Sequence, residues 1–401
     1  MRANVNTHKQ ERRAIRRILV LVPCDIFPPI HGSSTAAYFT VKYLAESNEV
    51  DVLLTHAYSQ GGKIDLIHAN LNIRYCHKTV LDSLGQMSAM FNPSFFNESF
   101  KLMKNCNSDI IQCELLYSMP AGILLKKKFK KPLIFVDENV EYLKFLQMGK
   151  SHYAPIVQKI EKLSCEQANV VITVSEIDKN EIMDNYHIPS EKIETIPHCV
   201  DSEMFKYTEK GRSFVRNKHD VNNESLVLTF VGKLDYIPNI TAVKYITERI
   251  YPAVIEKHPN SMFFVIGQNY ESLLSYRKKN VIFTGYVPPN ELPNYLSASD
   301  IVLVPLDSGS GTRLKTIEAA SCSRPIVSTK KGAEGQDFVS EKEIMLTQSV
   351  DEVFIDQVLR LMDDEKLRKR IGRNARKKIE EQYSWKQAVR QFERVYSKVL
   401  N

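Results

Sequence analysis

The sequence predicts an α/β protein with two doubly wound domains, each built on a parallel sheet with helices on both faces. Three observations lead to this prediction: the length of 401 residues, the alternation of short apolar runs with amphipathic stretches, and a restart of that alternation midway. Since one domain usually holds roughly 100–200 residues, we expect two domains. We place them at residues 1–205 and 206–401.

Short runs rich in Val, Ile and Leu are typical of parallel strands, because such strands are buried on both faces. In the first half these runs are Ile18–Val22, Val50–Leu54, Ile110–Cys113, Leu133–Val136, Val170–Val174 and Ile193–Ile196. In the second half they are Leu226–Val231, Phe263–Ile266, Val281–Phe283, Ile301–Val304 and Ile326–Ser328. The polar stretch 206–224 between them is the predicted linker. Ligands of doubly wound sheets bind at the carboxyl ends of the strands, so two facing sheets would enclose one cleft.

The last segment, 380–401, has helical periodicity and follows the last βα unit without a further strand. Its apolar positions are Tyr383, Trp385, Val389, Phe392, Val395 and Tyr396. Such a stripe needs a surface on which to be buried. We expect a helix that packs back on the first domain.

The composition excludes several classes of protein. It is typical of a soluble globular chain, with 43% hydrophobic and 25% charged residues, and the apolar runs are too short to span a bilayer. Residues 1–17 are polar and basic without an apolar signal segment, so we expect a cytoplasmic protein. The seven cysteines form no C-x-x-C pair and are odd in number, which predicts neither a disulfide framework nor a zinc site.

Two basic clusters stand out in a chain of net charge +7. One contains Arg12, Arg13, Arg16 and Arg17, and the other contains Lys126, Lys127, Lys128, Lys130 and Lys131. Either cluster could contact a phosphate-rich surface. Taken alone, each is better interpreted as a solvated arm or a solvated helix end.

The segment 301–325 carries the clearest chemical signal. A strand leads to a loop with Gly309 and Gly311, and a helix is expected to begin near Thr312. Unpaired amides at a helix N-terminus, a glycine loop and the cations Arg313 and Lys315 together favour binding of a diphosphate. Glu318 lies about 9 Å further along the helix at ~1.5 Å per residue, the reach from a diphosphate to a ribose. The alternative is a capped helix with a solvated polar face.

A dinucleotide fingerprint is missing. The loop after the first strand, 23–34, contains only one glycine, Gly32, and therefore no G-x-G-x-x-G motif. This weakens a dehydrogenase interpretation.

Several segments in order resemble family 4 of the GT-B glycosyltransferases. They are Glu318-Ala319 with Arg324-Pro325-Ile326-Val327, FVGKLDYIPN at 230–239, VITVSEID at 171–178, IPHCVD at 196–201, and Tyr383-Ser384-Trp385 before the last helix. The resemblance covers nearly the whole chain from Ile18 onward. It implies the GT-B fold, in which two Rossmann-like domains face a central cleft and the last helix returns to the first domain.

The resemblance also implies roles for particular residues. Donor binding falls on Gly232, Lys233, Gly267, Tyr286, Val287, Gly309, Ser310, Gly311, Thr312, Arg313, Lys315 and Glu318, and acceptor binding on His31, Gly32 and Ser33. Lys233 and Arg313 would stabilise the departing diphosphate, and Glu138 lies at a catalytic position of the first domain. Glu318 would bind the ribose of the nucleotide.

The chain departs from the family pattern at two positions. Ser310 replaces the first of two glutamates, and Glu138 replaces a histidine in the segment VDENVEY. A sub-group with G-S/V-G-T-R-L-K-x-x-E-A and D-Y-x-P-N resembles this chain at the first departure, so we interpret it as a sub-family trait. Asp137, Glu138 and Glu141 could instead form a polar loop, which we favour for Glu141.

The resemblance implies a retaining hexosyltransferase that moves a sugar from a UDP- or GDP-linked donor to a glycan or lipid-linked acceptor in polysaccharide or glycoconjugate synthesis. No D-x-D triplet occurs, so we expect no catalytic metal. We also expect no cofactor, because the nucleotide sugar is a substrate, and no nucleic-acid partner. The arm Arg12–Arg17 would make a peripheral contact with the inner face of a membrane. The alternatives are a GT-B-like nucleotide-sugar hydrolase or epimerase, and a non-catalytic nucleotide-sugar-binding protein.

Overall fold

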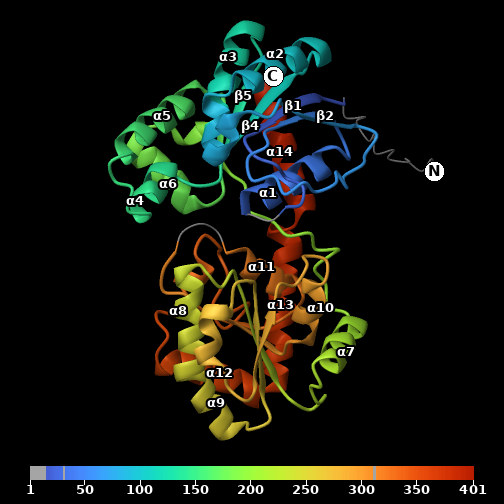
Figure 1. Cartoon of the computed structure of the whole chain (residues 1–401), viewed down its shortest axis with the longest axis vertical. Helices are drawn as coiled ribbons and strands as arrows, with labels where there is room; N and C mark the ends of the chain where they lie inside the picture. Colours follow the sequence, from blue (N-terminus) through green and yellow to red (C-terminus); the bar gives the residue numbers. More distant parts are fainter. Residues whose placement is uncertain (1–14, 30–31, 310–312) are drawn as a thin grey trace, which may run out of the picture. The chain divides into compact units, whose positions relative to one another are not determined.

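A computed structural model describes residues 15–29, 32–309 and 313–401 of the chain (Figure 1). The predicted site residues His31, Ser310, Gly311 and Thr312, and also Arg12 and Arg13, lie outside the described residues. Two compact units are distinguished: 1–136 with 166–169 and 399–401, and 137–165 with 170–398.

Within the described residues, the first seven strands form one parallel sheet in the order β3-β2-β1-β4-β5-β6-β7. Their bounds are β1 Arg17–Val22, β2 Glu49–Leu54, β3 Leu71–Tyr75, β4 Ile110–Glu114, β5 Leu133–Asp137, β6 Val170–Thr173 and β7 Ile193–Thr195. The helices between them are α1 Gly32–Leu44, α2 Pro93–Cys106, α3 Met119–Phe129, α4 Glu141–Gln147, α5 Ala154–Gln167 and α6 Glu176–Tyr186. The alternation of strand and helix that the sequence predicted is therefore present in this half.

The described part of the second half forms a six-stranded parallel sheet in the order β10-β9-β8-β11-β12-β13. Its strands are β8 Val227–Val231, β9 Met262–Ile266, β10 Val281–Gly285, β11 Ile301–Val304, β12 Ile326–Thr329 and β13 Met345–Thr347. The helices of this half are α7 Glu209–Lys218, α8 Ile237–Tyr245, α9 Tyr251–Lys257, α10 Leu292–Ala298, α11 Leu314–Ser321, α12 Glu352–Asp363, α13 Glu365–Gln382 and α14 Trp385–Leu400. Both sheets are doubly wound, as predicted.

Alternate side chains of the second sheet are buried on opposite faces, as the period of a strand requires. Phe263 and Val265 of β9 belong to the core under α8, α9 and α12. Phe264 and Ile266 instead pack with Val215 of α7 and with α10. Figure 1 shows α7 and α10 on the side of this sheet away from α8, α9 and α12.

Helix starts follow from short polar side chains in the sequence. Asn92, Ser175, Thr208, Asp351 and Asp364 each cap a helix by accepting a hydrogen bond from a backbone N–H in its first turn. Such a cap typically contributes about 1 kcal/mol, since it satisfies a donor that the helix leaves unpaired. These residues fix where the helices leave the sheets.

Two predicted segments differ from the structure. The expected linker contains α7, whose buried Arg216 donates to the Ala298 and Ser225 carbonyls and pairs with Asp300 at 2.7 Å. The expected helix 380–401 is two helices, because α13 ends at Gln382 and α14 begins at Trp385. Lys398 near the end of α14 lies 2.8 Å from the Glu194 carboxylate in β7. The domain boundary predicted at 205–206 falls between β7 and β8 and stays a prediction.

No helix in the described part of the chain is both long and apolar enough to cross a bilayer.

Candidate functional site

The carboxyl ends of β8 and β9 approach each other closely at two glycines. The Gly232 N–H donates to the Ile266 carbonyl at 2.9 Å. A Cβ at Gly267 would lie 1.9 Å from the Gly232 oxygen, and one at Gly232 would lie 2.8 Å from the Asn239 side chain. Neither position has room for a side chain. Glycine at the predicted donor residues Gly232 and Gly267 therefore allows this close approach of the two backbones and of the Asn239 side chain.

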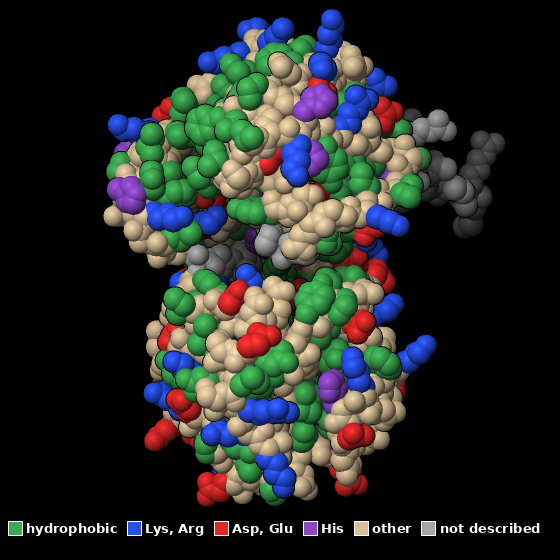
Figure 2. All heavy atoms as spheres, viewed as in Figure 1, with side chains coloured by type: hydrophobic (Ala, Val, Ile, Leu, Met, Phe, Trp, Pro, Cys, Tyr) green, Lys and Arg blue, Asp and Glu red, His purple; other side chains and the backbone are tan. Residues whose placement is uncertain are grey.

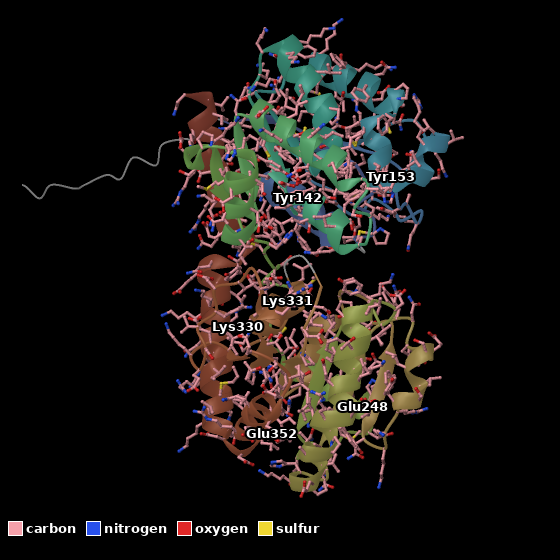
Figure 3. All side chains as sticks on the ribbon, turned by 90° about the vertical axis from the view of Figure 1, so that its left-hand side faces the viewer. Tyr142, Tyr153, Glu248, Lys330, Lys331 and Glu352 are labelled. Atoms are coloured by element: carbon pink, nitrogen blue, oxygen red, sulfur yellow. The ribbon has the colours of Figure 1, made fainter. Side chains whose placement is uncertain are left out.

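Arg313 is held beside the glycine loop that follows β11. Gly309 has φ of +101°, and a Cβ there would lie 3.2 Å from the Arg313 guanidinium and 3.0 Å from the Tyr236 hydroxyl. The guanidinium also reaches the Ser308 and Lys331 carbonyls, each at 3.5 Å. Figure 3 labels Lys331.

The environment of Arg313 is largely dehydrated. Arg313 is only 7% exposed to solvent. Burial lowers the pKa of the guanidinium, and Glu334 opposes that shift. The arginine remains charged because its ordinary pKa is far above neutrality. A fixed, partly dehydrated cation next to a glycine loop suits an anionic ligand.

Lys315 is oriented by a buried amide that lies on α8. Its Nζ donates to Asn239 Oδ1 at 2.9 Å and lies 4.6 Å from the centre of the Phe230 ring. Asn239 Nδ2 in turn donates to the Lys233 carbonyl at 2.8 Å. Asn239 therefore ties the turn after β8 to the first turn of α11. Burial, with Arg313 nearby, lowers the pKa of Lys315 to about 7.

Glu318 lies one turn beyond Lys315 on α11. Burial raises the pKa of its carboxyl to about 7, and Lys315 acts in the opposite direction. Side chains at i and i+3 share a helix face, so the ammonium and the carboxylate lie on the same side of α11. The structure thus brings Arg313, Lys315 and Glu318 together as the sequence predicted from the loop and helix.

The other predicted donor residues are more exposed. Lys233 pairs with Asp235 at 3.2 Å, and Asp235 also accepts from Asn269 at 2.8 Å. Tyr286 follows β10 and is 61% exposed, with the half-buried Val287 next to it. Their assignment to donor binding stays a prediction.

The predicted acceptor loop is described only in part. Gly32 begins α1 and is exposed, and no atom lies within 4 Å of a Cβ built on it. Ser33 accepts a hydrogen bond from Gln86 at 3.3 Å. These two residues lie after the carboxyl end of β1, where doubly wound sheets bind ligands.

Carboxylates gather at the carboxyl end of β5. Asp137 and Glu138 are 1% and 4% exposed. Neither oxygen of Asp137 has a hydrogen-bond partner in the described part of the chain. Burial raises the pKa of Asp137 well above its usual range, and Glu161 and Glu141 add to the shift. Glu138 is thus buried in an acidic region.

The polar loop favoured for Glu141 from the sequence is wrong, because Glu141 lies in a helix and is buried. It begins α4, is 1% exposed and pairs with Lys144 at 2.9 Å. The start of α4 is instead bound to Glu161 of α5. The Glu161 carboxylate accepts hydrogen bonds from the backbone amides of Glu141 and Tyr142, at 2.6 and 3.4 Å. It also accepts one from the Tyr186 hydroxyl. Figure 3 labels Tyr142 at this helix start.

Sequence reasoning missed Glu161 and did not assign a role to Asn239. A signal for Glu161 exists, because the buried positions of α5 include Ala154, Val157, Glu161 and Ser164 at helical spacing. A carboxylate on a buried stripe requires partners. For Asn239 the signal is its place directly after Pro238 at the start of α8.

Two family models match this chain. Residues 225–364 match the model of glycosyl transferases group 1, and residues 30–204 match that of glycosyltransferase family 4. An uncharacterized glycosyltransferase of Methanocaldococcus jannaschii is 24% identical over 96% of this chain and 99% of its own length.

Two solved structures have the same architecture. Sucrose-phosphate synthase from Thermosynechococcus elongatus superposes with a TM-score of 0.75 at 16% identity, covering 96% of this chain and 98% of that one. HepE of Anabaena, solved in complex with UDP, gives 0.74 at 14% identity, with 96% and 100% covered. The fold is therefore that of a GT-B glycosyltransferase with two Rossmann-like sheets. The chain belongs to the group 1, family 4 glycosyltransferases.

Proposed function

We propose that this glycosyltransferase moves a hexosyl group from a UDP- or GDP-linked sugar to an acceptor hydroxyl, with retention at the anomeric carbon. The observation that carries the proposal is the cluster of Arg313, Lys315 and Glu318 at the start of α11, with Asn239 orienting Lys315. Two cations and one carboxylate at this spacing suit a diphosphate and a ribose. HepE was solved with UDP and with UDP-glucose, which supports a donor of this class.

The chemistry follows from where charge develops. When the bond between the anomeric carbon and the diphosphate oxygen breaks, negative charge grows on the diphosphate. Arg313 and Lys315 interact more strongly with the diphosphate in the transition state, where this charge has grown, than in the ground state. This difference lowers the barrier. The acceptor oxygen bonds to the same face of the anomeric carbon, and its proton passes to the departing phosphate oxygen.

No divalent metal is required in this proposal. The cations that would neutralise the diphosphate are supplied by Lys233, Arg313 and Lys315, and the sequence contains no D-x-D triplet. Full turnover in excess EDTA is expected. Loss of turnover that Mg²⁺ or Mn²⁺ restores would contradict this part of the proposal.

The acceptor is a glycan or a lipid-linked glycan, and the enzyme is cytoplasmic with a peripheral contact to the inner face of the membrane through Arg12–Arg17. Arg17 itself begins β1 and pairs with Glu49 at 2.8 Å, so the contact would depend on the residues before it. Recovery with anionic but not neutral liposomes supports the contact. Equal recovery with both, or no change after deletion of 12–16, contradicts it.

The direct test is a panel of nucleotide sugars with detection of released nucleoside diphosphate and of transferred sugar. Transfer with the donor's anomeric configuration in the product supports the proposal. Release of free sugar without transfer to any acceptor would indicate a hydrolase, and an altered nucleotide sugar would indicate an epimerase. Binding without turnover would indicate a non-catalytic nucleotide-sugar-binding protein.

A further inference from the structure

A cavity lined by four lysines lies far along the chain from the donor residues. Its volume is about 440 Å³, and it is lined by Lys126, Lys127, Lys130, Lys131, Pro132, Gln167, Asn169 and Val399. All of these residues belong to the first compact unit. We call the cavity with Lys126, Lys127, Lys130 and Lys131 the lysine groove.

Backbone contacts hold the walls of the lysine groove in place. The Lys126 ammonium donates to the Gln167 carbonyl at 2.6 Å. Lys130 ends α3 in the left-handed conformation, with its N–H donating to the Lys126 carbonyl at 2.9 Å. Asn169 Oδ1 accepts from the Leu133 amide at 3.0 Å, which fixes the segment after α5 against the start of β5.

Three of the four lysines of the groove lack an acidic partner among the described residues. Among the described residues, no carboxylate forms an ion pair with Lys127, Lys130 or Lys131. The carbonyls at the C-terminal end of α3 favour cations in its last turn, which explains Lys126 and Lys127. Lys130 and Lys131 lie beyond that turn and add two more charges to the same cavity. The local field therefore favours an anion of several charges.

Lys128 provides an internal contrast within the same run of lysines. Its Nζ lies 5.1 Å from the centre of the Phe100 ring and 6.0 Å from that of Phe129, and it does not line the cavity. A cation over aromatic rings has an intramolecular partner. Figure 2 shows Lys and Arg side chains gathered over α2 and α3.

We propose that the lysine groove binds a ligand with two or more clustered phosphate groups, at a site separate from sugar transfer. Lysine ammonium groups bind phosphates as point charges, and the volume is within the range of small-molecule sites. The groove adjoins Pro132 before β5, whereas Gly32 and Ser33 follow the carboxyl end of β1. A five-residue strand spans about 17 Å, so the two places lie at opposite ends of the sheet.

Clustered phosphates occur on soluble polyphosphates and on the headgroups of anionic phospholipids. Two arms of the test distinguish these sources. In one arm, inorganic tripolyphosphate is titrated calorimetrically into the full chain with Arg313→Ala, so that the predicted donor site contributes little. In the other arm, the same chain is sedimented with phosphatidylcholine vesicles with and without 30% phosphatidylinositol 4-phosphate.

The variant that tests the groove is Lys127→Gln with Lys130→Gln and Lys131→Gln, and the matched control is Lys128→Gln. Lys126 is retained because its ammonium supports the Gln167 backbone. We expect the triple variant to weaken binding at least about ten-fold at low salt, with the control within about two-fold, because exposed charges act mainly where screening is weak.

If the triple variant loses tripolyphosphate binding but keeps vesicle recovery, the groove is assigned to a soluble ligand. If the triple variant loses vesicle recovery but keeps tripolyphosphate binding, the groove is assigned to phospholipid headgroups. The proposal is overturned if the triple variant equals the control in both arms, or if neither probe binds. Sugar transfer is not a readout here, so failure of this test leaves the proposed transferase activity unaffected.

Discussion

The carboxyl ends of the two sheets differ in their ionisable groups, which are cations at one and carboxyl groups at the other. At the second sheet, Arg313 and Lys315 are held by neutral oxygens, from backbone carbonyls and from Asn239. At the end of β5, Asp137, Glu138 and Glu161 are buried near one another, and mutual repulsion contributes to the raised pKa of Asp137.

The difference shows how each region uses burial. Neutral oxygens orient a buried cation without cancelling its charge, so the cation keeps its attraction for an anion. Buried carboxylates that repel each other favour the protonated form instead. The second sheet is therefore suited to an anionic donor, whereas the end of β5 can present neutral carboxyl groups that donate hydrogen bonds.

The largest expected effect comes from removing the cation beside Gly309. Arg313→Ala should lower kcat/KM for the nucleotide sugar by about 100-fold or more, since one preorganised charge at the leaving group is typically worth that much. Arg313→Lys should recover part of the loss. The exposed Arg370→Ala on α13 is the matched control and should change kcat/KM by less than about two-fold. Steady-state kinetics with unchanged thermal stability would settle the comparison.

Asn239 tests whether orientation of Lys315 matters as well as its charge. Asn239→Leu removes both hydrogen bonds of the amide and should raise the KM for the donor about ten-fold, because the Lys315 ammonium loses its acceptor. Asn239→Asp keeps an acceptor and adds a charge, so it should raise the pKa of Lys315 and move the alkaline limb of donor binding to higher pH. An unaltered pH profile in Asn239→Asp would indicate a purely structural residue.

Asp137→Asn should stabilise the protein at pH 8. Because the folded pKa of Asp137 is raised, the ionised carboxylate destabilises the folded state at high pH, and this penalty disappears as the pH falls toward the unfolded pKa. We expect a gain of about 1 kcal/mol at pH 8 and little change at pH 4. The control is Asp184→Asn on the exposed face of α6. If the two variants change the stability equally at pH 8, the claim that ionised Asp137 destabilises the folded state is wrong.

The smallest expected effect is in the pH dependence of donor affinity. Lys315 must keep its proton to bind a diphosphate, and Glu318 must lose its proton to accept from a ribose hydroxyl. Since both pKa values are about 7, affinity for a nucleotide sugar should peak near pH 7 and fall a few-fold on either side. Lys315→Gln should flatten the alkaline limb and Glu318→Gln the acidic limb. A flat profile in the unmodified chain contradicts this assignment.

Much of the fold could be predicted because the central strands are buried on both faces and therefore form continuous apolar runs. The two strands that were not predicted, β3 and β13, lie at the edges of their sheets. β3 alternates half-buried and exposed residues and includes Arg74, and β13 has only three residues. A run that short, or that polar, is not distinguishable from a loop by periodicity.

The candidate site was predictable where chemistry is local in sequence. Arg313, Lys315 and Glu318 occur within six residues, so one helix brings them together. Contacts between distant segments could not be predicted in this way. The bond from Lys315 to Asn239 spans 76 positions, and that from Tyr186 to Glu161 spans 25. They depend on tertiary packing that neither local spacing nor charge pattern encodes.

The most direct test of the donor site is calorimetric titration of the unmodified chain and of Glu318→Ala with UDP and GDP. One of the two nucleotides should bind the unmodified chain and raise its Tm. Glu318→Ala should weaken that binding by about 1–3 kcal/mol, if the carboxylate holds the ribose through charged hydrogen bonds. Absence of binding by either nucleotide at millimolar concentration, or equal affinity in Glu318→Ala, would contradict the assignment of the donor site to α11.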